Sequence, residues 1–524
     1  MHCGKISATR FRRDELYLEG GNYIMSFGDI IYALDDVLWG KPFLFFVFFI
    51  SIYFTLRSGL FQIVHFPHVM KNTLGALTSK EAKNKKEGTV SPFEAVCIAI
   101  GGCVGCGNMA GVASAIAVGG PGSLFWVWVA AFLGMMTKCV EISLAVYYRS
   151  KDEHGGYYSS TPTMVEKGLV RRRGIKAAMV VAVLFAIGFV AQFLGGSQAY
   201  TISEILHVSF GLPMMLVTVL YTAVLYYIIF GGTPRVAKVA TTLVPFMCVL
   251  FIVGGLGIII ANLDNVIPSI VEIFKYAFTP HAAVGAFTGT VVSKTISKGM
   301  ARSINSNEAG QGSSPLIHGS ANTVHPVRQG LWGSFEVFVD TIIVCSITGL
   351  AVIISGCWSN GMTGATLTIE SYRSVYGSVA PIFIGLMACL FGITTTAGWF
   401  TYYIAIIRWA FARKPKTRDM LCKLFKFVFP IPNLVIVGAI TLGGYSADLF
   451  WAIVDVSLII PVFSNLLAMF LLRNDFFALL KDYKARFMGK GTVDPNFHVF
   501  YEDDPKVFAE EEALRAELRK IEQA

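Results

Sequence analysis

Long apolar runs recur along almost the whole chain, and they limit the fold more than any other feature of the sequence. Hydrophobic residues make up 54% of the 524 residues and charged residues only 15%, whereas soluble domains carry about 25% charged residues. About 20 apolar residues cross the roughly 30 Å hydrocarbon layer of a bilayer as a helix. We therefore predict an all-α polytopic membrane protein with about eleven transmembrane helices. The runs are residues 42–56, 92–118, 123–148, 175–208, 213–230, 236–261, 282–312, 330–356, 380–411, 425–442 and 447–472.

The lysines and arginines between these runs are distributed unevenly. Alternate loops, beginning with residues 57–92, together hold 23 basic residues, and the other loops together hold 2. Because basic loops stay in the cytoplasm, we expect the N-terminus outside and the C-terminus in the cytoplasm. This alternation requires residues 282–312 to cross the membrane, although they carry four charged residues. Basic residues near the N-terminus oppose the orientation, and a natural start at Met25 would remove most of them.

The stretch GGCVGCGNMAG at residues 101–111 has five glycines and the spacing of a nucleotide-binding loop or a redox pair. A dinucleotide loop needs a preceding strand and an acid about 20 residues later, but this stretch lies inside an apolar run and the next acid is Glu141. No neighbouring charge would activate Cys103 or Cys106, and no histidine or acid is near enough in sequence to complete a metal site. These three interpretations are therefore disfavoured.

Two interpretations of residues 101–111 remain. Small residues four apart let helices pack closely in a membrane. Alternatively, the glycines interrupt the helix, and the unwound backbone binds an ion and a carboxylate, as in secondary transporters. The second interpretation predicts another interrupted helix five spans later, and the polar segment KGMARSINSNEAGQGSS at residues 298–314 lies there. Because each repeat has an odd number of spans, the second copy runs upside down. This pattern indicates a five-plus-five inverted repeat.

At these residues the sequence resembles the alanine or glycine:cation symporters, a family of prokaryotic sodium-coupled amino-acid carriers. The resemblance implies the leucine-transporter fold with two discontinuous helices and one extra N-terminal helix. It also implies uptake of a small amino acid such as alanine or glycine with sodium, across a bacterial inner membrane. It extends over about residues 39–472, and the matching blocks are residues 105–141, 299–321, 325–345 and 393–399.

This resemblance implies five segments of the chain. They are an N-terminal extension (1–40), an extra transmembrane helix with a basic cytoplasmic loop (41–91), the first inverted repeat (92–262), the second inverted repeat (263–473) and a charged cytoplasmic tail (474–524). The tail is expected to form an amphipathic helix from about Ala509 onward.

The resemblance also implies the residues of a substrate site and a sodium site. Backbone and side-chain groups near the first break are expected to face the substrate carboxylate, with further pocket residues from three other spans. Oxygen ligands suit a hard cation such as sodium. The implied substrate residues are Cys106, Gly107, Asn108, Gln198, Asn305, Ser306, Asn307 and Trp399. The implied sodium ligands are the carbonyls of Gly101 and Val104 and the hydroxyls of Thr394 and Thr395.

Three residues depart from the family pattern. Cys106 stands where the family usually has threonine, and Ser303 and Asn305 stand where it usually has glycine and phenylalanine. A polar residue in place of an aromatic pocket neighbour favours a more polar amino acid, such as serine or glutamine, as the alternative substrate. Coupling to protons instead of sodium is the other alternative.

Several charged residues lie inside the predicted spans, where charge is costly. Lys138 and Glu141 are three residues apart, so they are expected to form a pair on one helix face or to take part in gating. Glu308 and Asp340 have the same two interpretations. His318 and His325 are expected to be solvated in a cytoplasmic loop, together with the basic residues there.

Two other classes of membrane protein were weighed. An enzyme would need an acid–base or metal constellation near one membrane face, and the sequence contains none. A channel would need a symmetric ring of filter residues, whereas this chain has a pair of interrupted helices. A secondary carrier is therefore the leading prediction, and the sequence does not indicate an oligomeric state.

Overall fold

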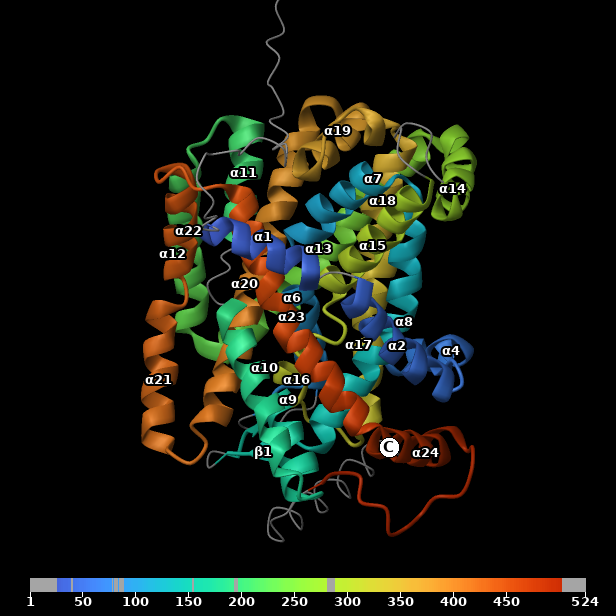
Figure 1. Ribbon diagram of the computed structural model, residues 1–524, viewed down its shortest axis with the longest axis vertical. Helices are drawn as coiled ribbons and strands as arrows, with labels where there is room; N and C mark the ends of the chain where they lie inside the picture. Colours follow the sequence, from blue (N-terminus) through green and yellow to red (C-terminus); the bar gives the residue numbers. More distant parts are fainter. Residues whose placement is uncertain are drawn as a thin grey trace, which may run out of the picture.

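The computed structural model describes residues 26–38, 41–77, 79, 83, 89–152, 155–192, 197–279 and 288–501, and these form one bundle of helices (Figure 1). Two short strands, β1 (Ser150–Lys151) and β2 (Tyr157–Tyr158), pair antiparallel, with Ser150 opposite Tyr158. The predicted tail helix from Ala509 onward lies outside the described residues.

The longer helices follow the apolar runs of the sequence. They are α1 (Phe27–Leu38), α2 (Lys41–Arg57), α6 (Pro92–Cys103), α7 (Val112–Gly119), α8 (Gly122–Tyr147), α10 (Met179–Ala191), α11 (Ser197–Phe210), α12 (Met214–Phe230), α13 (Gly232–Ala261), α14 (Leu263–Phe278), α15 (Thr288–Asn307), α17 (Pro326–Val337), α18 (Ser346–Ile354), α19 (Gly364–Tyr376), α20 (Ala380–Ala410), α21 (Pro415–Val428), α22 (Ile431–Thr441), α23 (Ala447–Leu471) and α24 (Arg473–Met488).

Short helical turns connect them. They are α3 (Phe61–Val64), α4 (Phe66–Asn72), η1 (Leu74–Ala76), η2 (Gly107–Gly111), α9 (Thr161–Met164), η3 (Val165–Arg171), η4 (Lys176–Ala178), α16 (Ser314–His318), η6 (Phe338–Cys345), η7 (Cys357–Ser359) and η8 (Gly377–Val379). Three of them, η2, η3 and η6, are π-helical, and π-helical turns occur often at functional sites.

The prediction of an all-α membrane protein is confirmed. Within the described residues, six helices are long and apolar enough to cross a membrane, and α6 with α7 forms one further, bent span. Helices also occupy the other predicted runs. Those in runs 42–56, 175–208 and 213–230 are shorter, and α15 is long enough but too polar, so the number eleven stays a prediction. The most apolar stretch of α8 is 83% buried, whereas that of α13 is only 33% buried. Helix α8 therefore lies inside the bundle, and α13 presents apolar side chains such as Val249 and Val253 outward, as lipid contact requires.

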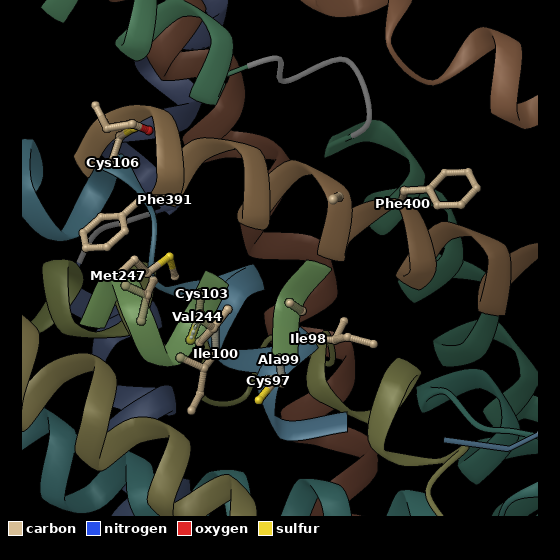
Figure 2. Packing of buried hydrophobic residues seen from close by; sticks show 14 of the residues in the cluster. Cys97, Ile98, Ala99, Ile100, Cys103, Cys106, Val244, Met247, Phe391 and Phe400 are labelled. Atoms are coloured by element: carbon tan, nitrogen blue, oxygen red, sulfur yellow. Dashed lines mark hydrogen bonds between the residues drawn. The ribbon is translucent and has the colours of Figure 1, made fainter. Parts of the chain in front are cut away.

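Helix α6 begins at a strong local signal. The Ser91 hydroxyl accepts a hydrogen bond from the Glu94 amide, the Glu94 carboxylate accepts one from the Ser91 amide, and Pro92 occupies the first turn. The helix ends at Cys103, and the chain continues in η2 and α7 with a bend of 50°. Ile100 and Cys103 pack against Val244 and Met247 of α13, as Figure 2 shows. The first predicted interruption is therefore present.

The second predicted interruption is present as well. Helix α15 ends at Asn307 and α16 begins at Ser314. The residues between them leave helical geometry, because Glu308, Gly310 and Gly312 have φ angles of 55°, 89° and 87°. Glycine adopts such angles readily, whereas Glu308 adopts them at a cost.

The two ends of the bundle carry different elements. Helices α14 and α19 lie at one end, and α24 and β1 lie at the other (Figure 1). The loops predicted to be rich in basic residues contain β1 and β2, and the loop around α19 belongs to the opposite set. The described loops of the two sets therefore lie at opposite ends, as the charge asymmetry predicts, and which end faces the cytoplasm stays a prediction.

Candidate functional site

A cavity of about 480 Å³ lies where the two interrupted helices meet. Cavities that hold small ligands are typically about 300–1,000 Å³. Seven of the eight predicted substrate residues line it, together with one predicted sodium ligand. These lining residues are Cys106, Gly107, Asn108, Gln198, Asn305, Ser306 and Trp399, with Thr395.

The first break is stabilised by neutral groups. The Gly105 amide donates to Asn108 Oδ1 over 2.9 Å, and the Cys106 amide donates to Gln198 Oε1 over 3.1 Å. A side chain at position 105 would collide with Thr395 and Gln198, so the close approach of α20 and α11 requires glycine there. The amides of the unwound backbone thus already donate to side-chain oxygens. The Cys106 amide, which donates to Gln198, could donate to a carboxylate instead.

The thiol of Cys106 does not point at that amide. Its Sγ atom lies 3.6 Å from the carbonyl oxygen of Ala388 in α20, and the residue is fully buried. The sequence predicts that this position contacts the substrate carboxylate. Cys106 lines the cavity, but its thiol is turned toward the Ala388 carbonyl of α20.

The predicted sodium ligands come from α6 and α20, which lie against each other. Thr395 Oγ1 is 3.2 Å from the carbonyl oxygen of Val104. The hydroxyl of Thr394 instead donates to the carbonyls of Leu390 and Phe391 in its own helix. The two oxygens from Val104 and Thr395 are the kind of ligands that a hard cation binds. Gly101 lies beside Val244 of α13 and Thr394 of α20, and a side chain there would fit only if these neighbours shifted slightly.

A buried carboxylate, Asp340 in η6, connects the two breaks. Its oxygens accept hydrogen bonds from Asn108 Nδ2 (2.6 Å), Ser306 Oγ (2.8 Å) and Thr341 Oγ1 (2.6 Å). Within the described part of the chain, no basic side chain forms an ion pair with it. The sequence left Asp340 open between structural and coupling roles. It lies behind Asn108 and Ser306, which line the cavity, and does not line the cavity itself.

Asn307 differs from the other predicted substrate residues because its side chain faces away from the cavity. Its Nδ2 atom donates to Ser303 and Thr341, over 3.1 Å in each case, and its carbonyl accepts from Lys138 Nζ over 2.8 Å. Ser303, the second departure from the family pattern, thus contacts Asn307 and is itself fully buried.

Asn305 does line the cavity, and its Oδ1 atom is buried without a hydrogen-bond partner among the described residues. Arg302, one helical turn earlier, also lines the cavity, and its Nε atom is likewise buried without a hydrogen-bond partner among the described residues. A buried amide oxygen without a partner costs about 1–3 kcal/mol. A hydrogen-bond donor that reached this shielded oxygen, after a change of the Asn305 rotamer, would remove that cost.

Lys138 and Glu141 do not pair with each other in the way that their spacing predicts. Lys138 Nζ lies 3.1 Å from Glu336 Oε1 in α17, and both side chains are fully buried. The Glu141 carboxylate accepts the amides of Gly310 (2.9 Å) and Gly312 (2.7 Å) in the second break. Both residues of α8 therefore hold segments of the second repeat in place.

The prediction that His318 and His325 are solvated is wrong. Their exposed fractions are 0% and 1%. His318 Nδ1 lies 2.7 Å from the Gln329 amide and its Nε2 is 3.6 Å from Glu336. His325 is the N-cap of α17 and accepts the Val327 amide. The sequence His-Pro at 325–326 is a possible N-cap signal, because proline is common at the first helical position.

Comparisons with known proteins show the family of the chain. The family model of the sodium:alanine symporter family matches residues 25–498. An uncharacterized transporter of Haemophilus influenzae is 35% identical, over 88% of this chain and 97% of its own length. The sodium/alanine symporter AgcS of Methanococcus maripaludis is 35% identical over 72% of this chain and 82% of its own length. The probable sodium/glutamine symporter GlnT of Bacillus subtilis is 33% identical, over 90% and 93% respectively.

A solved structure supports the fold. The structure of MhsT in complex with L-phenylalanine superimposes with a TM-score of 0.56 over 76% of this chain and 93% of MhsT, at 12% identity. At that identity the likeness concerns the fold alone, and it confirms the leucine-transporter architecture predicted from the sequence. The relatives named above are a transporter and two symporters. From the family match and these relatives together, the chain belongs to the sodium:alanine symporter family.

Proposed function

We propose that this protein couples the inward flow of sodium to the uptake of a small amino acid by alternating access. The observation that carries the proposal is the meeting of two interrupted helices around one cavity, with the Val104 carbonyl and the Thr395 hydroxyl 3.2 Å apart at its edge. A sodium ion between these oxygens would join α6 to α20. Sodium bound there would thus stabilise the shape of the cavity that the substrate enters.

The substrate carboxylate is proposed to bind at the first break. The Cys106 amide now donates to Gln198 Oε1, so binding requires the Gln198 side chain to rotate or to turn its amide group toward the carboxylate. When no substrate is bound, Gln198 Oε1 accepts the hydrogen bond of the Cys106 amide. The empty site therefore has no unpaired amide there, which would cost free energy. The ring of Trp399 stacks on Phe189 at a centroid distance of 5.3 Å and donates its Nε1 proton to the Gly102 carbonyl, so it forms a fixed wall.

Two classes of amino acid are proposed as substrates, and Asn305 distinguishes them. Alanine, or the similarly small glycine, is the first proposed class, and AgcS carries alanine in its name. The unpartnered Oδ1 of Asn305 favours an amino acid whose side chain donates a hydrogen bond, such as serine or glutamine, and GlnT carries glutamine in its name. An amide or hydroxyl donor at Asn305 would be worth roughly 1 kcal/mol.

Proton coupling is the second candidate mechanism, and Asp340 is the observation that favours it. A carboxylate buried in a protein at membrane depth needs a proton or a cation to neutralise it. Asp340 has three hydrogen-bond donors and no ion-pair partner among the described residues. A proton or a second sodium ion at Asp340 would connect the ion to Asn108 and Ser306 and so to the cavity.

Uptake into proteoliposomes tests these proposals. Each of the twenty amino acids is offered with an inward sodium gradient, with an inward proton gradient alone, and with neither. The proposal expects accumulation of small amino acids only with sodium. Accumulation driven by the proton gradient in sodium-free buffer, and lost in Asp340→Asn, would establish proton coupling instead. Equal uptake with no gradient would rule out a coupled carrier.

The orientation proposed here places the N-terminus outside the inner membrane and the C-terminus in the cytoplasm. Labelling of cysteines placed in residues 357–379 and 157–170 checks it.

A further inference from the structure

The chain after α24 loops outward and then returns to the bundle at residues 499–501 (Figure 1). Residues 489–501, here called the C-terminal strap, run along the end of the molecule that holds α24 and β1 (Figure 1). The Tyr501 amide donates to the Tyr147 carbonyl at the end of α8 over 2.9 Å. Val499 and Phe500 are only 2% and 3% exposed. A segment with no docking role would leave these apolar side chains in water, so the strap is docked at its last residues, 499–501, whereas residues 489–496 are exposed.

Helix α24 holds the beginning of the strap against the rest of the protein. The Tyr483 hydroxyl lies 3.0 Å from His68 Nε2, and Lys484 Nζ donates to the Ser58 carbonyl over 3.3 Å. Asp482 lies 3.3 Å from His325, the N-cap of α17. The strap is therefore fixed at both ends, by α24 and by Tyr501.

Phe500 contributes to a stack around Arg149, the residue that follows the last turn of α8. The Arg149 guanidinium lies between two rings, 3.9 Å from the centroid of Tyr157 and 4.5 Å from that of Phe500. Its Nη1 atom donates to the Ala321 carbonyl over 2.9 Å. Planar contact with two rings orients the guanidinium as well as attracting it. The strap thus helps to hold the arginine that binds the segment after α16.

The segment after α16 is in turn bound to the start of α6. The Val90 amide donates to the Ser320 carbonyl (3.2 Å), and the Asn322 amide donates to the Val90 carbonyl (3.0 Å). Helices α6 and α16 belong to the two interrupted spans that surround the cavity, and both lie toward this end of the bundle. An unbroken path of contacts therefore leads from Phe500 through Arg149 and Ala321 to α6.

We propose that the C-terminal strap is a latch that holds α6 and α16 together and keeps the cavity closed at this end. The inference rests on the proposed function, because a carrier must open its cavity toward each side in turn. For the cavity to open here, α6 or α16 has to move away from the end of α8. That movement breaks the Val90 pairing or the Arg149 bond, and both are supported by the docked strap. Undocking of Phe500 lowers the cost of opening.

Hydrogen exchange of the full-length protein in nanodiscs tests the latch directly. The Val90 and Asn322 amides report the pairing, because each exchanges only when its hydrogen bond opens. In Phe500→Ala the exchange of peptides covering both amides is expected to rise about tenfold, the effect of one lost buried cation–π contact. Val493→Ala is the matched control, since Val493 lies in the same strap but is 44% exposed. It is expected to exchange at the wild-type rate.

Tyr501→Pro provides a second variant that leaves the buried side chains in place. It removes the amide that donates to Tyr147 and the Tyr501 ring that contacts Tyr148 and Arg172, but it leaves Phe500 beside Arg149, so a smaller rise at Val90 and Asn322 is expected. The proposal is overturned if exchange rises only within the strap and the end of α8, or if Val493→Ala behaves like Phe500→Ala. A latch also predicts weaker apparent affinity for external substrate in Phe500→Ala, because fewer molecules have the cavity closed at this end. Wild-type uptake tests the proposed function separately, so the two can fail independently.

Discussion

Both interrupted helices leave backbone groups without helical hydrogen bonds, and different kinds of side chain bind these groups at the two breaks. The first break, between α6 and α7, is held by neutral groups: Asn108 and Gln198 bind its amides, and glycine allows α20 to approach. The second break, between α15 and α16, is held by charge: Glu141 accepts two of its amides, and Lys138 binds its Asn307 carbonyl. The difference indicates that the second break is a fixed support, and that the first break has groups free to exchange partners with an ion and a substrate.

The largest effect is expected when the charges behind the second break are unbalanced. Lys138→Met leaves Glu336 buried without its partner. Breaking a buried pair in this way costs about 3–5 kcal/mol of folding stability. The melting temperature of the purified protein in detergent measures it. The double variant Lys138→Met, Glu336→Leu removes both charges and is expected to recover much of the loss. A single variant as stable as wild type would mean that the pair does not hold the second break.

A smaller loss is expected when the support of the second break is made neutral. Glu141→Gln keeps the shape of the side chain but replaces a carboxylate that accepts the Gly310 and Gly312 amides. Removing one such hydrogen bond costs about 1–3 kcal/mol. Melting temperature and sodium-driven uptake should therefore fall together. If uptake is lost at unchanged stability, Glu141 acts in coupling and the contrast between the two breaks disappears.

At the first break the expected effect is on the ion rather than on stability. Thr395→Val removes the oxygen that lies 3.2 Å from the Val104 carbonyl. The loss of one ligand should weaken the apparent sodium affinity of uptake roughly five- to tenfold. Thr394→Val is the control, because its hydroxyl is bonded within its own helix. Equal weakening by both variants would show that Thr394 is a ligand as well, and no weakening by either would show that the sodium site lies elsewhere.

The smallest effect is expected at Cys106. Its thiol faces the Ala388 carbonyl, so Cys106→Thr exchanges one weak donor for a stronger one away from the substrate amide. The order of preference among glycine, alanine, serine and glutamine should stay the same. In Asn305→Phe, by contrast, the order should shift toward alanine. Competition uptake with the four amino acids compares the two variants. A changed order in Cys106→Thr would show that the thiol reaches the substrate during transport.

Much of the fold and of the cavity could be predicted because the signals are local. Apolar length predicts the helices, and the glycines at 101–111 and the polar residues at 298–314 mark both breaks. The partners of the buried charges could not be predicted in the same way. Lys138 and Glu141 are neighbours on one helix, but each binds a group about 170 residues or more away in sequence. Only the packing of α8 against α15 and α17 decides those contacts, as it decides the burial of His318.

The pairing of Val90 with residues 320–322 also has a consequence for how the protein is made. A ribosome adds about 5–20 residues per second, so the second half of this contact emerges roughly 10–50 s after the first. Glu141 similarly enters the membrane long before the Gly310 and Gly312 amides exist. During that interval Lys138, one turn away, is the nearest opposite charge available to it. Lys138 and Glu141 do not pair in the mature protein, although their spacing predicts it. In the nascent chain a temporary Lys138–Glu141 pair would neutralise both charges until the second repeat is inserted.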